Sequence, residues 1–279
     1  MARDVVKIRI KRYNPESKKI WWQEYDVPII EGMTVLDALL YIKENIDSTL
    51  AIRYSCRMGI CGSCGMLING VPRLACYTQI GMLKTKTIVI EPLPNFPVIR
   101  DLATDFTLFF EKHRIVKPYL IRRDKYEQEN PVREYRMLPE ELDGIKQFVY
   151  CIYCGLCYSA CPITGVDKEY LGPQALMYAY RFIIDVRDEG FMERLNIVDD
   201  THGCHRCHLA LSCSSVCPKG VDPGYAIQML RKILLHRNLG KLKIKTRGSP
   251  VVEPLKHMPK YAKKPPQPTI ENPQWENNI

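Results

Sequence analysis

The N-terminal part of the chain carries a mixed pattern of strand-like and helix-like apolar positions. Residues 6–10 alternate Val and Ile with Lys and Arg, which predicts a half-buried strand. A less regular strand is predicted over residues 20–30, and Thr34 is a plausible N-cap for a helix over residues 35–46. These elements indicate a mixed α/β module.

A hairpin and a last strand complete this module. Residues 66–72 form two short segments around an Asn69-Gly70 turn, a dipeptide that favours a tight hairpin. Residues 87–91 predict another strand. The order strand, strand, helix, loop, hairpin, strand is typical of a β-grasp ferredoxin domain.

A proline-rich segment, residues 92–100, separates this module from a helical one. Beyond it, apolar residues recur at helical spacing, and helices are expected within residues 101–116, 139–150, 173–190 and 223–238. We therefore predict an α+β protein. Its expected parts are a β-grasp domain at residues 1–98, an all-α domain with a bacterial-ferredoxin-like two-cluster core at residues 99–240, and a basic, Pro-rich extension at residues 241–279.

Composition supports a globular chain. Of the 279 residues, 46% are hydrophobic and 25% are charged, which excludes a wholly disordered protein. No apolar run approaches the length of about 18 residues that a membrane-spanning helix needs. The start shows neither a secretory signal nor a transit peptide. We therefore expect a chain that does not cross a membrane by itself.

The formal net charge of +9 belongs mainly to the C-terminal end. Lys and Arg are concentrated in residues 237–264, where Glu253 is the single acid. Two interpretations of this segment stay open: a solvated extension, or an arm that wraps a partner subunit or lies near anionic lipid. The rest of the chain is nearly charge-balanced.

Twelve cysteines, in three groups of four, carry the candidate chemistry. Disulfides are rare in a reducing cytosol, so metal ligation is the better interpretation. The first group has the Cys-x4-Cys-x2-Cys spacing of a plant-type [2Fe–2S] ferredoxin and comprises Cys56, Cys61, Cys64 and Cys76. The glycines in this loop suit a backbone that wraps a cluster. A structural zinc site, the alternative, normally uses paired Cys-x2-Cys knuckles.

The second and third groups both follow the run of a bacterial ferredoxin, Cys-x2-Cys-x2-Cys-x3-Cys-Pro. The second group is intact and comprises Cys151, Cys154, Cys157 and Cys161, followed by Pro162. The third group has Ala210 where the second cysteine of the run belongs, and it comprises Cys204, Cys207, Cys213 and Cys217. In two-cluster ferredoxins the last cysteine of one run ligates the cluster of the other.

This exchange of ligands predicts two clusters in the helical domain. A [4Fe–4S] site is expected at Cys151, Cys154, Cys157 and Cys217. A missing thiolate favours a three-iron cluster, so a [3Fe–4S] site is expected at Cys161, Cys207 and Cys213. Cys204 is left over; it is either a substitute fourth ligand or a thiol without a ligand.

Together these motifs resemble the iron–sulfur subunit of succinate dehydrogenase and fumarate reductase, over roughly residues 3–240. The resemblance rests on Ser55–Gly65 with its cysteines and glycines, Cys151–Pro162, Leu171–Pro173, Tyr180–Asp188 and Cys213–Pro223.

The resemblance implies an electron-transfer subunit without catalytic residues of its own. A flavoprotein subunit with covalent FAD would oxidise succinate or reduce fumarate. Electrons would pass through the [2Fe–2S], [4Fe–4S] and [3Fe–4S] centres to a quinone. Membrane-anchor subunits would hold the complex, which places this chain peripherally on the cytoplasmic face of a prokaryotic cell membrane. A nucleic-acid partner is not expected.

The chain departs from the family pattern around the implied quinone site. Residues 163–167 contain no Trp, whereas family members with a ubiquinone site carry Trp there. His208 matches a family position near the quinone, and the alternative is an ordinary surface histidine. His202 and His205 are either surface residues or proton carriers.

Two other protein classes share part of these features. A zinc-bearing nucleic-acid-binding protein has Cys-x2-Cys pairs and a basic charge, but the loop of the first cysteine group is not a zinc pattern. The electron-transfer subunit of another flavin-dependent dehydrogenase would carry similar clusters. The motifs of the helical domain weigh against that second alternative.

Overall fold

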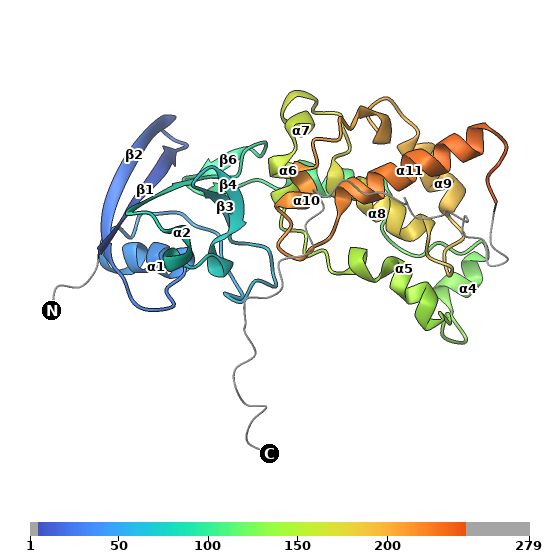
Figure 1. The fold of residues 1–279 in the computed structure, drawn as a ribbon, viewed down its shortest axis with the longest axis horizontal. Helices are drawn as coiled ribbons and strands as arrows, with labels where there is room; N and C mark the ends of the chain where they lie inside the picture. Colours follow the sequence, from blue (N-terminus) through green and yellow to red (C-terminus); the bar gives the residue numbers. More distant parts are fainter. Residues whose placement is uncertain (1–4, 244–279) are drawn as a thin grey trace, which may run out of the picture.

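The computed structural model describes residues 5–243, in which a sheet-containing part and a helical part lie side by side (Figure 1). The sheet has five strands in the order β2-β1-β5-β3-β4. Its only parallel neighbours within the described residues are β1 and β5. The strands are β1 (Val5–Asn14), β2 (Lys19–Pro28), β3 (Gly65–Ile68), β4 (Val71–Leu74) and β5 (Thr87–Glu91).

The predicted elements of this β-grasp part are confirmed. The even-numbered residues of β1 from Val6 to Ile10 are buried and the intervening cations are exposed, as the alternation requires. Helix α1 (Val35–Asn45) begins with a capping box between Thr34 and Asp37. Asn69 and Gly70 both have positive φ, 48° and 76°, which is the geometry of a type I′ hairpin turn.

The helix expected from residue 101 begins later than predicted. Residues 98–104 instead form a small hairpin of β6 (Val98–Arg100) and β7 (Ala103–Thr104), and α3 (Thr107–Ile115) follows. The reason is Asp101, whose φ of 47° turns the chain. Its buried carboxylate accepts hydrogen bonds from Arg12 at 2.9 Å and from the Ala51 amide at 2.9 Å, and these tertiary contacts override the helical pattern. The boundary predicted after residue 98 falls inside β6.

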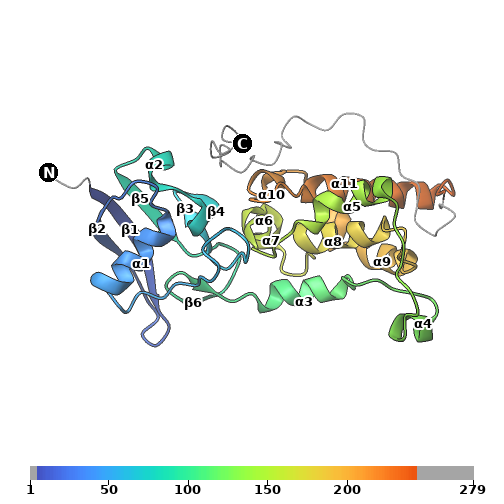
Figure 2. The same ribbon diagram turned by 90° about the horizontal axis from the view of Figure 1, so that it is seen from below.

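Helices α8 and α11 pack against each other in the helical part, and α3 runs along the side of α8 that is opposite to α11 (Figure 2). The longer helices are α5 (Pro139–Val149), α8 (Pro173–Ile183), α9 (Phe191–Val198) and α11 (Pro223–Asn238). Short elements carry or flank the cysteines, namely α6 (Leu156–Ala160), α7 (Pro162–Val166), α10 (Ser212–Ser215) and the 3-10 turn η2 (Cys204–Arg206). The remaining short elements are η1 (Ala75–Tyr77), α2 (Ile80–Leu83) and α4 (Lys125–Glu129).

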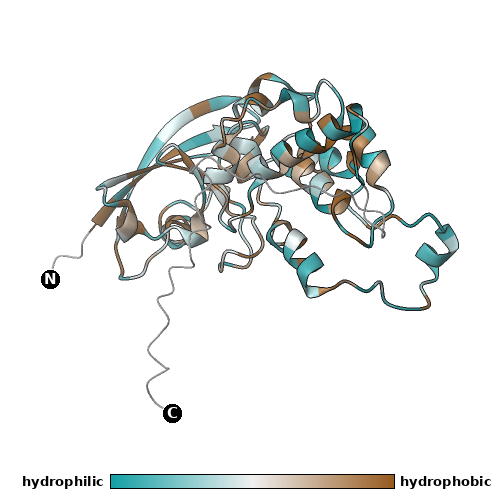
Figure 3. Cartoon of the chain, turned by 45° about the vertical axis from the view of Figure 1, so that its right-hand side comes forward, coloured by the Kyte–Doolittle hydropathy of each residue, from teal (hydrophilic) through white to brown (hydrophobic). Residues whose placement is uncertain are grey.

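Apart from α3, the helices predicted in this part begin close to their expected starts. α5 and α11 span their predicted ranges closely, whereas α8 ends at Ile183 rather than near residue 190. Its extension is blocked because the Asp185 carboxylate binds the backbone and side chain of Arg187, which bends the chain into a turn before α9. α4 and its flanks project from the body and are largely hydrophilic (Figure 3).

No helix within residues 5–243 has the length and apolar character needed to cross a bilayer. The predicted extension begins at residue 241, so nearly all of it, residues 244–279, lies outside the described residues. The two interpretations of that segment stay predictions.

Two apolar cores lie within residues 5–243, and the first of them crosses the junction between the two parts. It starts at the sheet and α1 and ends at Cys154, Leu156 and Tyr158 of the helical part. Asn95 ties the same junction with polar contacts: its side-chain nitrogen donates to the Ser159 carbonyl at 2.9 Å and lies within 3.3 Å of the carbonyls of Tyr158 and Cys161. The two parts are therefore packed against each other and not only joined by a linker.

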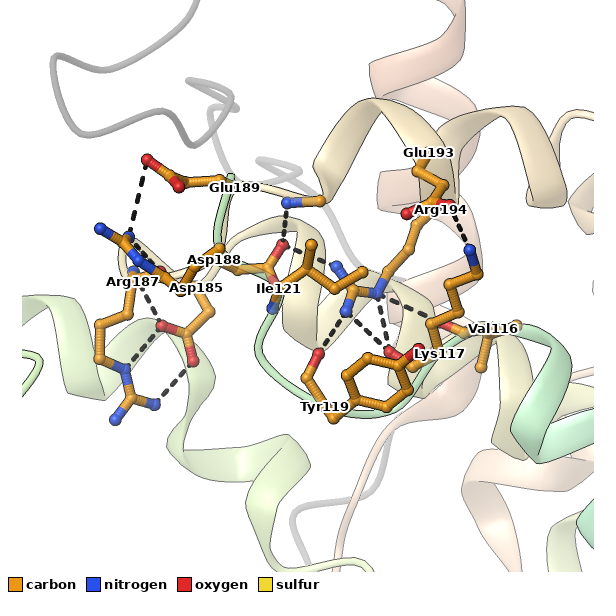
Figure 4. A network of polar contacts seen from close by, with 12 residues as sticks. Val116, Lys117, Tyr119, Ile121, Asp185, Arg187, Asp188, Glu189, Glu193 and Arg194 are labelled. Carbon is orange, nitrogen blue, oxygen red and sulfur yellow. Dashed lines mark hydrogen bonds and ion pairs between the residues drawn. The ribbon is translucent and has the colours of Figure 1, made fainter. Parts of the chain in front are cut away.

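Arg194 of α9 anchors the segment that follows α3 (Figure 4). Its side chain is fully buried, pairs with Asp188 at 2.6 Å, and donates to the carbonyls of Val116, Lys117 and Tyr119. Asp188 also accepts the Ile121 amide at 2.9 Å. The Arg194 guanidinium thus donates to three backbone carbonyls of the segment that follows α3.

Replacing Arg194 is expected to destabilise the helical part strongly. Arg194→Met leaves Asp188 as an uncompensated buried charge, and loss of one partner from such a pair costs about 3–5 kcal/mol in free energy of unfolding. Urea denaturation followed by circular dichroism measures this. Glu193→Gln is the matched control, because Glu193 forms an exposed ion pair with Lys117 worth at most about 1 kcal/mol. Equal losses in both variants would contradict the anchoring role.

Candidate functional site

The first cysteine site lies in the loop between α1 and β3 and is completed by η1. Cys64 and Cys76 lie with their sulfurs 3.2 Å apart, and backbone amides of the loop point at the thiols. The Cys56 sulfur accepts from the amides of Ile60 at 3.3 Å and Cys61 at 3.2 Å, and the Cys76 sulfur accepts from Gly59 at 3.2 Å. This arrangement brings together all four predicted ligands, Cys56, Cys61, Cys64 and Cys76.

Hydrogen bonds favour the thiolate form of two cysteines at the first site, Cys61 and Cys76. Burial alone would raise the pKa of Cys61, but hydrogen bonds from Ser63 and the Cys56 amide outweigh it and hold that pKa at about 7. The hydrogen bond from Cys64 lowers the pKa of Cys76 to about 6, while the same contact and burial raise the pKa of Cys64. Thiolates are the form that ligates iron, so the lowered pKa values of Cys61 and Cys76 suit binding of a cluster.

The backbone of this loop takes the shape that the glycines predicted. Arg57, Gly59 and Gly62 have φ of 60°, 69° and 74°, so the loop folds back over its own sulfurs. Positive φ at these three positions lets several amides of the loop face one centre.

The second site is a cavity between the loop that precedes α6, helices α6 and α8, and the segment that leads into α11. Its lining contains Cys151, Cys154, Cys157 and Cys217, the four ligands predicted for a [4Fe–4S] cluster. Tyr153 and Gly155 have φ of 55° and 73°, and a Cβ on Gly155 would lie 2.7 Å from the Phe106 ring. The exchange of the last cysteine between the two runs, inferred from the motif alone, thus matches the lining of this cavity.

Burial dominates the electrostatics of the second site. It raises the pKa of both Cys151 and Cys154 to about 12, and it raises the pKa of Cys157 further. A cluster needs all four as thiolates, so its binding releases protons. The four thiols line a single cavity, and the closely spaced run that supplies three of them is the ligand pattern of an iron–sulfur cluster and not of a zinc site.

The third site contains the remaining predicted ligands, Cys161, Cys207 and Cys213. They share one neighbour, Tyr170, whose side chain is fully buried. Burial raises the pKa of Tyr170, and the charges of these thiolates raise it further. Leu209 and Leu211 have φ of 61° and 57°, so the exposed segment around Ala210 makes two left-handed turns.

Sequence reasoning missed Tyr170, because a lone aromatic residue at the end of a loop gives no pattern. It also missed that Gly62 contacts the second site, because a glycine in a loop does not show which segment packs against it.

Cys204 and the histidines lie in different surroundings. Cys204 is fully buried in the second apolar core, and burial raises its pKa to about 12, which favours a packed neutral thiol. His202 contacts Asp167 at 3.0 Å and His205 contacts Asp199 at 2.7 Å, so both pair with carboxylates. His208 follows Cys207 directly and is exposed.

The first and second sites touch through Gly62. A Cβ built on this glycine would lie 2.8 Å from the Cys154 Cα and 2.8 Å from the Ile152 carbonyl oxygen. Only hydrogen fits in that space. The second and third sites are linked by α6, which carries Cys157 of the second site and ends at Cys161 of the third. The three sites therefore form a continuous series.

Replacing Gly62 is expected to push the first two sites apart. Gly62→Ala forces the loops to separate, so the magnetic coupling between reduced clusters at these sites should weaken in pulsed EPR of the assembled complex. Gly70→Ala is the matched control: its φ of 76° imposes the same left-handed strain, about 1–2 kcal/mol, but nothing lies within 4 Å. Unchanged coupling in Gly62→Ala would contradict a spacing role for this contact.

Comparison with known families gives two matches that fall on these sites. Residues 7–111 match the model of a 2Fe-2S iron-sulfur cluster binding domain, which contains the first site. Residues 147–221 match a 4Fe-4S dicluster domain, which contains the second and third sites.

Curated relatives match across most of the chain. The fumarate reductase iron–sulfur subunit of Mycobacterium tuberculosis is 46% identical over 242 residues, covering 86% of this chain and 96% of the relative. That of Escherichia coli O6:H1 is 42% identical, covering 80% and 90%. The mitochondrial succinate dehydrogenase [ubiquinone] iron–sulfur subunit of Candida glabrata is 40% identical, covering 81% and 90%.

A solved structure has the same fold. A chain of the Mycobacterium smegmatis Sdh1 complex in the apo form superposes with a TM-score of 0.77 at 28% identity, covering 85% of this chain and 98% of that one. The predicted α+β architecture and electron-transfer role are thereby confirmed. The chain belongs to the family of iron–sulfur subunits of fumarate reductase and succinate dehydrogenase.

Proposed function

We propose that the chain conducts electrons between the FAD of a flavoprotein subunit and a quinone, by way of a [2Fe–2S], a [4Fe–4S] and a [3Fe–4S] cluster held at its three cysteine sites. The observation that carries this proposal is the series of sites within one packed body. The clusters supply one-electron redox chemistry when bound. The chain supplies their spacing, their charge environment and the exclusion of water.

Each site offers a different environment to its cluster. The first lies near the surface under amide donors, and the second is enclosed at the junction of the helices. Reduction potential depends on cluster type, net charge, hydrogen bonds to sulfur and solvent exposure. Three unlike sites in series therefore suit a graded path between a two-electron flavin and a quinone.

The donor set of the third site supports a three-iron cluster. Cys161, Cys207 and Cys213 supply three thiols, and Ala210 stands at the position of the fourth. The neighbouring Cys204 lies in the apolar core. Residues 208–210 are exposed, so the position where the run lacks its second cysteine lies at the surface of the chain.

The quinone is assigned to the exposed end of the third site. His208 and Leu209 are exposed there, and Leu209 retains 45% of its surface. Apolar residues beside a polar donor suit an amphipathic quinone ring and an anchor subunit in the membrane. We assign the chain peripherally to the cytoplasmic face of a prokaryotic membrane, held there by anchor subunits, as the family resemblance implies.

Restoring the missing cysteine tests the three-iron assignment. Ala210→Cys should replace the EPR signal of an oxidised three-iron cluster by that of a reduced four-iron cluster, because a fourth thiolate completes the ferredoxin run. Ser212→Cys, two residues along the same segment, is the control and should leave the three-iron signal in place. An oxidised wild-type complex without any three-iron signal would contradict the assignment.

Replacing His208 tests the quinone assignment. His208→Ala should slow quinone reduction by succinate at least several-fold, while reduction of the clusters by succinate continues at the wild-type rate. His205→Ala removes a histidine from the same segment that is paired with Asp199, and it should preserve quinone turnover. Wild-type quinone kinetics in His208→Ala would exclude a quinone role for this residue.

A further inference from the structure

Lys112 of α3 is a buried cation without a carboxylate partner. Only 4% of the surface of Lys112 is exposed. The other two buried cations of residues 5–243 are paired: Arg12 with Asp101 at 2.9 Å and Arg194 with Asp188 at 2.6 Å. Within the same described range, Lys112 forms no ion pair within 4.0 Å. Burying an unpaired charge costs desolvation free energy, so a buried ammonium is expected to have a compensating anion nearby.

Neutral oxygens hold the ammonium in place. The Lys112 nitrogen donates to the Tyr170 carbonyl at 2.6 Å and to the Tyr158 hydroxyl at 3.1 Å. It also lies 5.3 Å from the centre of the Tyr158 ring, within cation–π range. Burial lowers the pKa of Lys112 to about 8, opposed by the charge of Asp167, so the side chain is mainly protonated at neutral pH.

Both acceptors belong to residues near the third site, because Tyr158 and Tyr170 each interact electrostatically with Cys161. Tyr158 stands in α6 between Cys157 and Cys161. Tyr170 offers its carbonyl to Lys112, while its side chain lies among the thiols of Cys161, Cys207 and Cys213. The Lys112 ammonium therefore lies on the α3 side of the third site, and Tyr158 and Tyr170 separate it from the thiols.

We propose that Lys112 is a charge-compensating residue that raises the reduction potential of the cluster at the third site. The inference rests on the proposed three-iron cluster. That cluster brings the missing anion, because three thiolates bind it. Reduction adds one electron and one negative charge without making or breaking a bond, so a fixed cation stabilises the reduced form more than the oxidised form.

Redox titration of the intact complex, followed by EPR at pH 7, tests the proposal. Lys112→Gln keeps an N–H donor but removes the charge, and Lys112→Met removes both. Each should lower the potential of the three-iron signal by roughly a tenfold change in the reduction equilibrium, which is about 59 mV for one electron. Lys112→Arg keeps the charge and should stay near the wild type. Lys146→Gln, which removes an exposed cation from α5, should leave the potential unchanged.

The outcomes separate charge from packing. A wild-type potential in either neutral variant that assembles would overturn the proposal. A drop in Lys112→Arg equal to that in Lys112→Gln would also overturn it, because packing and not charge would then set the potential. A wild-type complex that lacks the three-iron signal removes the cluster assignment itself, whereas a normal signal with an unshifted potential refutes the role of Lys112 alone.

Discussion

The contact between the two cysteine loops at Gly62 is the constraint on which the rest of the structure depends. Electron transfer between centres weakens steeply with distance, so two domains that carry separate sites must be packed together without a gap. The hydrogen of Gly62 against the Cys154 backbone achieves this. The first apolar core, which continues across the junction, and the Asn95 contacts to α6 keep the loops in register.

Burying several thiolates in one small protein costs desolvation free energy, and the chain surrounds the thiols differently at each site. The first site uses backbone amides directed by positive φ at Arg57 and Gly59. The second site encloses its thiols so fully that burial keeps them protonated without a cluster. The third has Lys112, which Tyr158 and Tyr170 separate from the thiols. These differences in charge environment are what a graded electron path needs.

Local sequence patterns were enough for the strands of the five-stranded sheet, the main helices and the grouping of the cysteines, because each depends on nearby residues. The Thr34 capping box and the Asn69-Gly70 turn are examples. Contacts between distant segments were beyond such reasoning. Asp101 replaces a predicted helical turn by a bend because it binds Arg12, far away in the chain. Lys112 gives no sign in the sequence of lying beside tyrosines near a cluster site.

In the proposed function, electrons from the flavoprotein's substrate reach clusters held by this chain. The most direct measurement is EPR of the purified complex before and after anaerobic addition of succinate. Succinate should reduce the clusters, with loss of an oxidised three-iron signal. A colourless chain that contains zinc, or clusters that stay oxidised while the flavin is reduced, would contradict the proposed function.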